Sequence, residues 1–165
     1  MSFIAIDYNK CVGCKNCEFS CAFHNNGNCN TVFSSIKVDV YPADYLSLPS
    51  TCMHCEDAWC MNICPRGAIS RDEELGGVVV DKRLCAGCKS CIITCPFGNM
   101  HFDKLNKTVF KCDLCGGNPQ CVKHCIAGAL TYCKDNNYDE IKRDSMHKKL
   151  SQLLKSREFI NREGC

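Results

Sequence analysis

Cysteine is the residue whose type and spacing carry the chemistry of this sequence. The chain has 19 cysteines among 165 residues, above the roughly 8–10% at which a short chain is expected to need more than apolar packing. Sixteen of them form four groups, which are Cys11, Cys14, Cys17 and Cys21; Cys52, Cys55, Cys60 and Cys64; Cys85, Cys88, Cys91 and Cys95; and Cys112, Cys115, Cys121 and Cys125. Cysteines spaced like this in a reduced protein are typical metal ligands.

The spacing within the groups predicts iron–sulfur cubes. The first and third groups read C-x2-C-x2-C-x3-C, and the other two widen only the middle gap. Cysteines at i, i+3 and i+6 can wrap three corners of a [4Fe-4S] cube, and in the bacterial two-cluster pattern the fourth cysteine ligates the other cluster. We therefore expect four [4Fe-4S] clusters, held in pairs close enough to exchange electrons.

Structural zinc is the alternative reading, because zinc sites also use C-x2-C pairs. Zinc sites usually combine two separated pairs, so they explain a triplet such as Cys11, Cys14 and Cys17 poorly. A zinc-stabilised binding module without redox activity would be colourless and would contain no labile sulfide.

The N-terminal residues, the hydropathy and the net charge indicate the cellular compartment and the classes of partner. The N-terminus MSFIAIDYNK has no basic region and no apolar stretch of signal length, so we expect a cytoplasmic protein with reduced thiols. No apolar run approaches the roughly 20 residues that cross a bilayer. The formal charge of +2 treats every thiol as neutral, and four thiolate-ligated cubes would shift it by about −8. We therefore draw no nucleic-acid prediction from it.

An internal repeat indicates the elements that position the cysteines. IAIDYNKCVGCKNC at Ile4–Cys17 aligns without gaps to VVVDKRLCAGCKSC at Val78–Cys91, which predicts a short strand entering a cluster loop in each copy. Gly67, Gly98 and Gly128 each follow the last cysteine of a group by three residues. They predict equivalent turns.

Two further segments between the groups show strand signals. In Thr31–Tyr41, the apolar Ile36, Val38 and Val40 alternate with charged residues, which predicts a half-buried strand. Glu73–Gly77 is typical of a hairpin turn before the next strand.

With its motifs assembled, the sequence resembles the four-cluster ferredoxin-like electron-transfer subunits of molybdenum and tungsten enzymes, carbon monoxide dehydrogenases and hydrogenases. The match runs from Phe3 to Tyr132, and its most specific stretches are CMHCEDAWCMNICPRGAI, CAGCKSCIITCPFGNM and KCDLCGGNPQCVKHC. Family members often have proline where this chain has Ala58 and Ile126. Neither departure removes a ligand.

The resemblance implies an α+β fold of two nested bacterial-ferredoxin-like units, with short strands and helices around the clusters and a C-terminal helix. The expected boundaries are 1–30 and 105–137 for the outer two-cluster unit, 31–51 for a strand-rich insertion, 52–104 for the inner two-cluster unit, and 138–165 for the helical tail. An apolar stripe over Tyr138–Glu163 predicts that this tail either docks onto a partner, the reading we favour, or covers the chain's own core.

The resemblance also implies which cysteines share a cluster, with the first group paired to the fourth and the second to the third. The four expected ligand sets are Cys11, Cys14, Cys17 and Cys125; Cys52, Cys55, Cys60 and Cys95; Cys85, Cys88, Cys91 and Cys64; and Cys112, Cys115, Cys121 and Cys21.

The implied function is an electron relay of anaerobic metabolism within a hetero-oligomer. One partner would be a catalytic oxidoreductase subunit, either a tungsten or molybdenum aldehyde or formate oxidoreductase, with the aldehyde type favoured, or a carbon monoxide dehydrogenase. The other would be a second redox protein or subunit. We expect no independent catalytic site, because no nucleotide-binding or H-E-x-x-H motif is present and every cube is fully ligated.

Five further cysteines and histidines are possible ligands that we do not assign to a cluster. Cys29, Cys133 and Cys165 lie outside the groups, and sixteen ligands already complete four cubes. His54 and His124 lie within the ligand loops, where we expect hydrogen bonding near sulfur rather than ligation.

Three residues beside the groups have an ordinary structural reading as well as a functional one. Trp59 either shields a cluster or lies at a subunit interface, with core packing at least as well supported. Lys107 and Lys111 flank the fourth group and either steer an acidic partner or, by default, are solvated surface charges.

Overall fold

The strands of this computed structural model are short and paired in twos. It describes residues 2–134, 143–144, 147–148 and 150–151. Within these, four two-stranded antiparallel sheets pair β1 with β8, β2 with β3, β4 with β5, and β6 with β7. The strands are β1 Ser2–Ile6, β2 Ile36–Tyr41, β3 Leu46–Thr51, β4 Ile69–Arg71, β5 Val78–Val80, β6 His101–Asp103, β7 Thr108–Phe110 and β8 Leu130–Lys134. Because a two-stranded sheet is at best marginally stable alone, the loops between strands must contribute to stability.

Every described α-helix up to residue 134 begins one residue before the third cysteine of a group. These helices are α1 Asn16–Asn26, α2 Trp59–Asn62, α3 Ser90–Thr94 and α4 Gln120–Lys123, with the 3-10 turns η1 Thr31–Phe33, η2 Pro42–Asp44 and η3 Leu114–Gly117 between them. Lys15 and Lys89 precede α1 and α3 with left-handed φ angles of 58° and 66°. The sequence repeat is therefore also a repeat of backbone conformation.

The three predicted glycine turns are confirmed. Gly67, Gly98 and Gly128 have φ angles of 60°, 64° and 61°. Each glycine amide donates to the carbonyl of the last cysteine of its group, at 3.2, 3.3 and 3.1 Å respectively. Only glycine adopts this conformation without strain, so the turn returns the chain toward the following strand.

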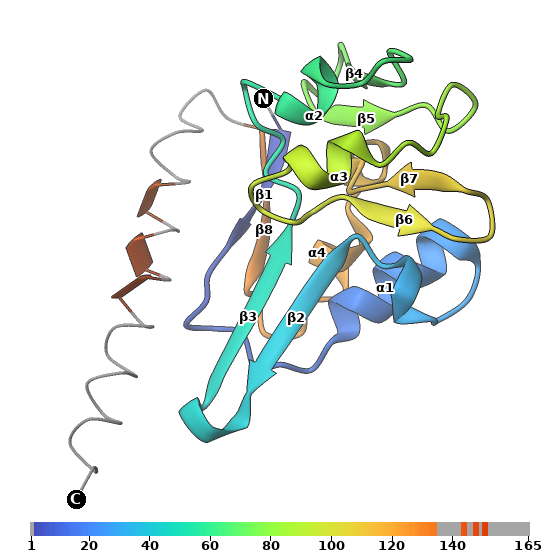
Figure 1. Ribbon diagram of the computed structural model, residues 1–165. Helices are drawn as coiled ribbons and strands as arrows, with labels where there is room; N and C mark the ends of the chain where they lie inside the picture. The colour runs from blue at the N-terminus through green and yellow to red at the C-terminus, as the bar shows by residue number, and fades with distance from the viewer. Residues whose placement is uncertain (1, 135–142, 145–146, 149, 152–165) are drawn as a thin grey trace, which may run out of the picture.

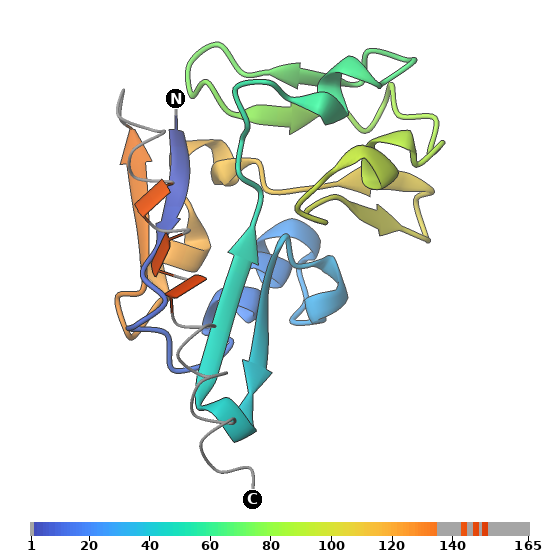
Figure 2. The ribbon, with the colours of Figure 1, turned by 60° about the vertical axis from the view of Figure 1, so that its left-hand side comes forward.

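Both strands of the internal repeat are present, but they have different kinds of partner. β5 pairs with the neighbouring β4 across a turn at 73–77, which confirms the predicted hairpin. β1 pairs with β8, from Ser2 opposite Lys134 to Ile6 opposite Leu130. Figures 1 and 2 show β1 and β8 together on one side of the molecule, with β4–β7 gathered away from them.

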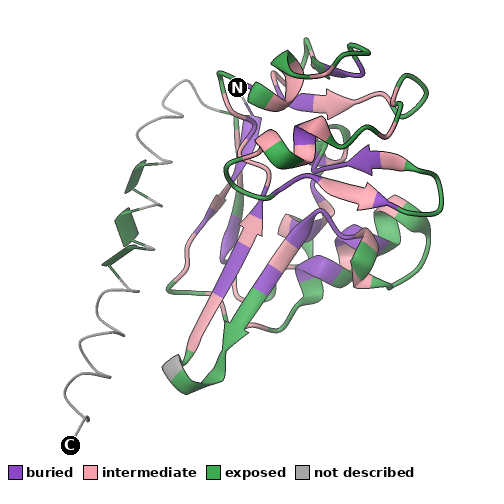
Figure 3. Ribbon diagram, viewed as in Figure 1, coloured by how far each residue is buried: buried purple, intermediate pink, exposed green. Residues whose placement is uncertain are grey.

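The strand predicted over Thr31–Tyr41 is correct only in its second part. Thr31–Phe33 forms η1 instead, because the Asn30 side chain accepts the amide of Val32 and caps the turn. The strand begins at Ile36, and Ile36 and Val38 are buried as expected. Val40 is 42% exposed because the β2–β3 hairpin projects beyond the rest of the molecule, as Figure 3 shows.

The core contains cysteines in both of its parts. One cluster of buried side chains is Ile4, Ile6, Cys17, Cys21, Ile36, Val38, Cys112, Leu114, Cys121 and Leu130. The other is Ala58, Ile69, Val78, Cys91, Met100 and Val109, with Cys60, Cys64, Cys85 and Cys95 packed against it. The predicted ligand groups therefore lie where larger proteins place apolar side chains.

Most of the helix expected over Tyr138–Glu163 lies outside the described residues. The six described residues of this segment are helical and exposed, and they include an ion pair of 2.7 Å between Lys148 and Asp144. Among the described residues, no helix combines the length and the apolar character needed to cross a membrane.

Candidate metal centres

Four cysteines from two different groups line one cavity between α2 and the end of α3. Its volume is about 160 Å³, and its cysteines are Cys52, Cys55 and Cys60 of the second group and Cys95 of the third. The Pro96 that follows Cys95 is also part of the wall. A cysteine preceding proline is disfavoured in helical geometry, so α3 ends at Cys95, which has an extended backbone.

A second, smaller cavity is also lined by four cysteines from two groups, here the first and the last along the chain. Its four cysteines are Cys112, Cys115 and Cys121 of the fourth group together with Cys21 of the first. Cys21 reaches this cavity because it lies within α1, which continues for five residues beyond it. No proline or glycine turn follows Cys21, in contrast to the other three groups.

The remaining cysteines form two further sets of neighbours. The pKa of the Cys17 thiol is raised to about 12, mainly by burial, and the negative charges of Glu18, Cys11 and Cys125 act in the same direction. The pKa of Cys11 is raised by burial and then by Cys125 and Cys14. These four thiols therefore lie close enough to repel one another once ionised.

Cys91 is the centre of the other set. Burial raises the pKa of its thiol to about 11. The neighbouring thiols that act in the same direction are Cys60, Cys85 and Cys64. Cys88 is exposed, and hydrogen bonding to Ser90 lowers the pKa of its thiol.

Electrostatic interactions also join thiols of different sets. Burial raises the pKa of the Cys121 thiol, and the charge of Cys17 of the first group acts in the same direction. The pKa of Cys112 is raised to about 12, mainly by burial, and the charge of Cys52 of the second group acts in the same direction. Cys60 of the second group acts likewise on Cys91 of the third group. These interactions link the sets in the sequence first group, fourth group, second group, third group.

Backbone amides are directed at several of these sulfur atoms. The amides of Ala68 and Ala129 donate to Cys64 Sγ at 3.3 Å and Cys125 Sγ at 3.2 Å, directly after the equivalent glycine turns. The amides of Ser35 and His54 donate to Cys21 Sγ at 3.3 Å and Cys52 Sγ at 3.4 Å. Such donors stabilise negative charge on sulfur.

The donor sets fit [4Fe-4S] clusters. Each set supplies four sulfurs, several with an N–H donor, and buried thiols gather where they are costly to ionise without a cation. Among the described residues, no three His, Cys, Asp or Glu side chains converge on a single metal ion. A single zinc ion lies about 2.3 Å from each sulfur, whereas a cube places its thiolates farther apart because four irons lie between them.

Gly87, inside the C-x-G-C loop of the third group, lies against the β6–β7 turn. Its φ is +68°, and a Cβ there would collide with the backbone carbonyl oxygen of Lys107. Gly98 has a similar φ of +64° but open space around it. Substitution of Gly98 therefore tests backbone strain alone, whereas substitution of Gly87 tests backbone strain together with a collision.

Gly87→Ala is expected to destabilise the cluster-loaded chain more than Gly98→Ala. Left-handed φ alone costs an alanine roughly 1–2 kcal/mol, and the collision at Gly87 brings the total to about 3 kcal/mol or more. Denaturant titration of anaerobic protein, followed by visible cluster absorbance, measures both. Equal losses for the two variants would contradict the close approach.

Those residues set aside as ligands that the structure describes lie outside the four sets. Cys29 is exposed, Cys133 is half-buried, and Cys165 lies outside the described residues. His54 is fully buried, and its Nδ1 accepts the amide of Val78 at 3.0 Å. His124 is exposed, with Nδ1 2.9 Å from the carbonyl oxygen of Gln120.

Two of the alternatives stated for surface residues are corrected. Trp59 is 60% exposed and is not a core residue. Lys111 is not a solvated surface charge, because it is only 6% exposed, whereas Lys107 is exposed as expected. The sequence around Lys111 carries no sign of its burial, since one of the two carbonyls that accept its Nζ belongs to Val78, 33 residues earlier.

Comparison with known proteins agrees with iron–sulfur binding by these cysteines. A family model described as "4Fe-4S dicluster domain" matches residues 43–135. The chain is 39% identical over 124 residues to the polyferredoxin-like subunit of aliphatic sulfonate oxidoreductase from Pyrococcus furiosus, covering 74% of this chain and 70% of that protein. Identity to the electron transport protein HydN of Escherichia coli is 35% over 160 residues, covering 82% and 89%. One of the polypeptides of E. coli anaerobic dimethyl sulfoxide reductase is 34% identical over 148 residues, covering 77% and 70%.

Proposed function

This protein is a member of the 4Fe-4S dicluster family of electron-transfer proteins, and from this premise we propose that it binds four [4Fe-4S] clusters and relays electrons within an oxidoreductase complex. The observation that carries the proposal is the pair of cavities, each lined by four cysteines drawn from two groups. A cluster in each would be held by distant parts of the chain, so that binding and folding are coupled.

We assign the sixteen ligands to the four sets expected from the sequence. The two cavities and the two sets of mutually charged thiols support this assignment. The pairing of β1 with β8 supports an outer unit of 1–30 and 105–137 around an inner unit of 52–104, with the β2–β3 hairpin as the insertion of 31–51. We propose that the tail of 138–165 docks onto a partner subunit.

The row of sets suits a relay between two surfaces. Among the sixteen proposed ligands, only Cys14 and Cys88 are exposed. They belong to the first and third groups, which stand at the two ends of the row. An electron can therefore enter at one end and leave at the other, while no ligand of the two middle sites is exposed.

The protein's part in the transfer is to hold and screen the redox centres. Each cluster supplies a site that gains or loses one electron. The amides of Ser35, His54, Ala68 and Ala129 stabilise the added negative charge without moving. Burial of Cys17, Cys112 and Cys121 shields part of each of the two sets of the outer unit from water.

The proposed partner at one end is a catalytic oxidoreductase subunit, which makes the protein a component of a hetero-oligomer. Two relatives are by name parts of such enzymes, an aliphatic sulfonate oxidoreductase and an anaerobic dimethyl sulfoxide reductase. A tungsten or molybdenum aldehyde or formate oxidoreductase, or a carbon monoxide dehydrogenase, remains our proposal for this chain. Native purification with identification of the co-eluting subunit tests it.

Metal and sulfide analysis of anaerobically prepared protein tests the cluster assignment. The expected result is a brown protein with about sixteen iron and sixteen acid-labile sulfide per chain. About eight of each would reject the count of four clusters. Zinc without sulfide in a colourless protein would reject electron transfer and support the binding-module alternative.

A further inference from the structure

Lys111 is a buried ammonium group at the junction of segments far apart in the sequence. It directly precedes Cys112, and its side chain is almost fully enclosed. Nζ donates to the carbonyl of Val78 in β5 and, at 2.7 Å, to the carbonyl of Cys112. Lys111 therefore connects the strand before the third cysteine group to the start of the fourth.

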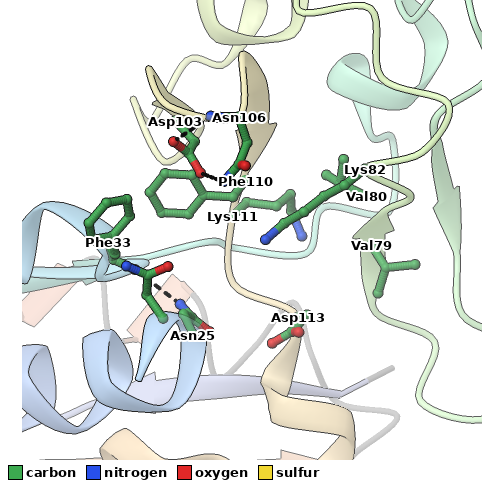
Figure 4. A pocket seen from close by; sticks show the side chains of 11 residues that line it. Asn25, Phe33, Val79, Val80, Lys82, Asp103, Asn106, Phe110, Lys111 and Asp113 are labelled. Carbon is green, nitrogen blue, oxygen red and sulfur yellow. Dashed lines mark hydrogen bonds between the residues drawn. The ribbon is translucent and has the colours of Figure 1, made fainter. Parts of the chain in front are cut away.

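No carboxylate neutralises this charge among the described residues. Their ion pairs are Lys10–Asp7, Arg83–Asp81 and Lys148–Asp144, and none includes Lys111. Asp103 and Asp113 line the same cavity of about 190 Å³ as Lys111, as Figure 4 shows, but lie beyond ion-pair distance. A buried charge is costly unless an opposite charge compensates it.

The cysteine sets are a second source of negative charge beside Lys111. Lys111 is part of the wall of the cavity that Cys52, Cys55, Cys60 and Cys95 line. Its Nζ also donates to the backbone carbonyl of Cys112, the first cysteine of the fourth group, at 2.7 Å. The charge of Lys111 thus acts on the second and the fourth groups together.

We propose that Lys111 is the counter-cation of the two middle clusters and raises their reduction potentials relative to the cluster of the first group. The proposal rests on the four-cluster relay. A fixed positive charge stabilises the reduced form of a cluster, because that form carries one more negative charge. Lys111 acts through the clusters and takes no part in transferring the electron.

The first group has a buried carboxyl group beside it. Glu18 is 5% exposed, and its Oε1 accepts the amide of Val38 at 2.6 Å. It follows Cys17 directly, so the buried ionisable group next to the first group is an acid rather than a base.

Redox titration of the reconstituted full chain, followed by electron paramagnetic resonance, tests the role of Lys111. Lys111→Met should lower the potentials of the middle clusters, with about a tenfold lower ratio of reduced to oxidised cluster at a fixed potential. Lys111→Gln, which keeps a neutral N–H donor, should do the same. Lys111→Arg should retain the wild-type potentials, and so should the exposed control Lys107→Met.

Three results would overturn the proposal. Unchanged potentials in a loaded Lys111→Met or Lys111→Gln protein would show that the charge is not felt by the clusters. An equal fall in Lys111→Arg would indicate a packing role. Loss of clusters from both neutral variants, with full loading of Lys111→Arg, would make the charge a requirement for assembly instead. Absence of sulfide from the wild-type protein would reject the relay itself, so the two failures are distinguishable.

Discussion

Cys21→Ser is expected to damage the cluster of the fourth group and spare that of its own group. Cys21 lines the cavity of Cys112, Cys115 and Cys121, and its sulfur accepts hydrogen bonds from the amide of Ser35 and the side-chain amide of Asn25. A serine oxygen is a poorer ligand for this soft site. Iron should fall from about sixteen to about twelve per chain, or one cluster signal should change.

The matched control is Cys29→Ser, because Cys29 is exposed and belongs to none of the four sets. It should retain full iron and sulfide. Iron and sulfide analysis with electron paramagnetic resonance distinguishes the Cys21→Ser protein from the Cys29→Ser protein. Damage confined to a cluster of the first or the second group would contradict the exchange of ligands between the first and fourth groups.

Removal of iron and sulfide is expected to abolish the cooperative fold. Its strands form two-stranded sheets, which are only marginally stable alone, and both parts of the buried core include cysteines. Without iron–sulfur clusters, these thiols lose the bonds that join distant loops. The loss should approach the whole stability of a domain, about 5–15 kcal/mol, and thermal unfolding followed by circular dichroism should show no sharp transition.

Reconstitution supplies the control for this experiment. Iron with sulfide should restore the transition, whereas zinc alone should not, since zinc cannot span the same thiolates. A cluster-free chain that keeps its sharp transition would show that apolar packing is sufficient.

The features predictable from the sequence are those set by local spacing. The repeat at Ile4–Cys17 and Val78–Cys91 predicts two strands, and the glycine turns follow from a fixed distance to the last cysteine. Both depend on a few adjacent residues. The spacing does not predict that the strand begins as late as Ile36, because the side chain of Asn30 caps a 3-10 turn over Thr31–Phe33.

Other features depend on contacts that spacing does not encode. Lys111 is buried by Val78, which lies 33 residues earlier in the chain. Trp59 is exposed although it adjoins a proposed ligand. Without the family resemblance, the cysteine spacing would not say which loop supplies the fourth sulfur of each site, because that depends on which helices face one another.

The pairing of β1 with β8 has a consequence for biosynthesis. β1 leaves the ribosome before every other described strand, yet its partner β8 is completed only at Lys134. A nascent chain must therefore expose β1 as an unpaired edge strand until β8 is synthesised, a state that invites aggregation. The hairpin of β4 and β5 can close much earlier, so we expect metallation in the cell to proceed from the inner groups outward.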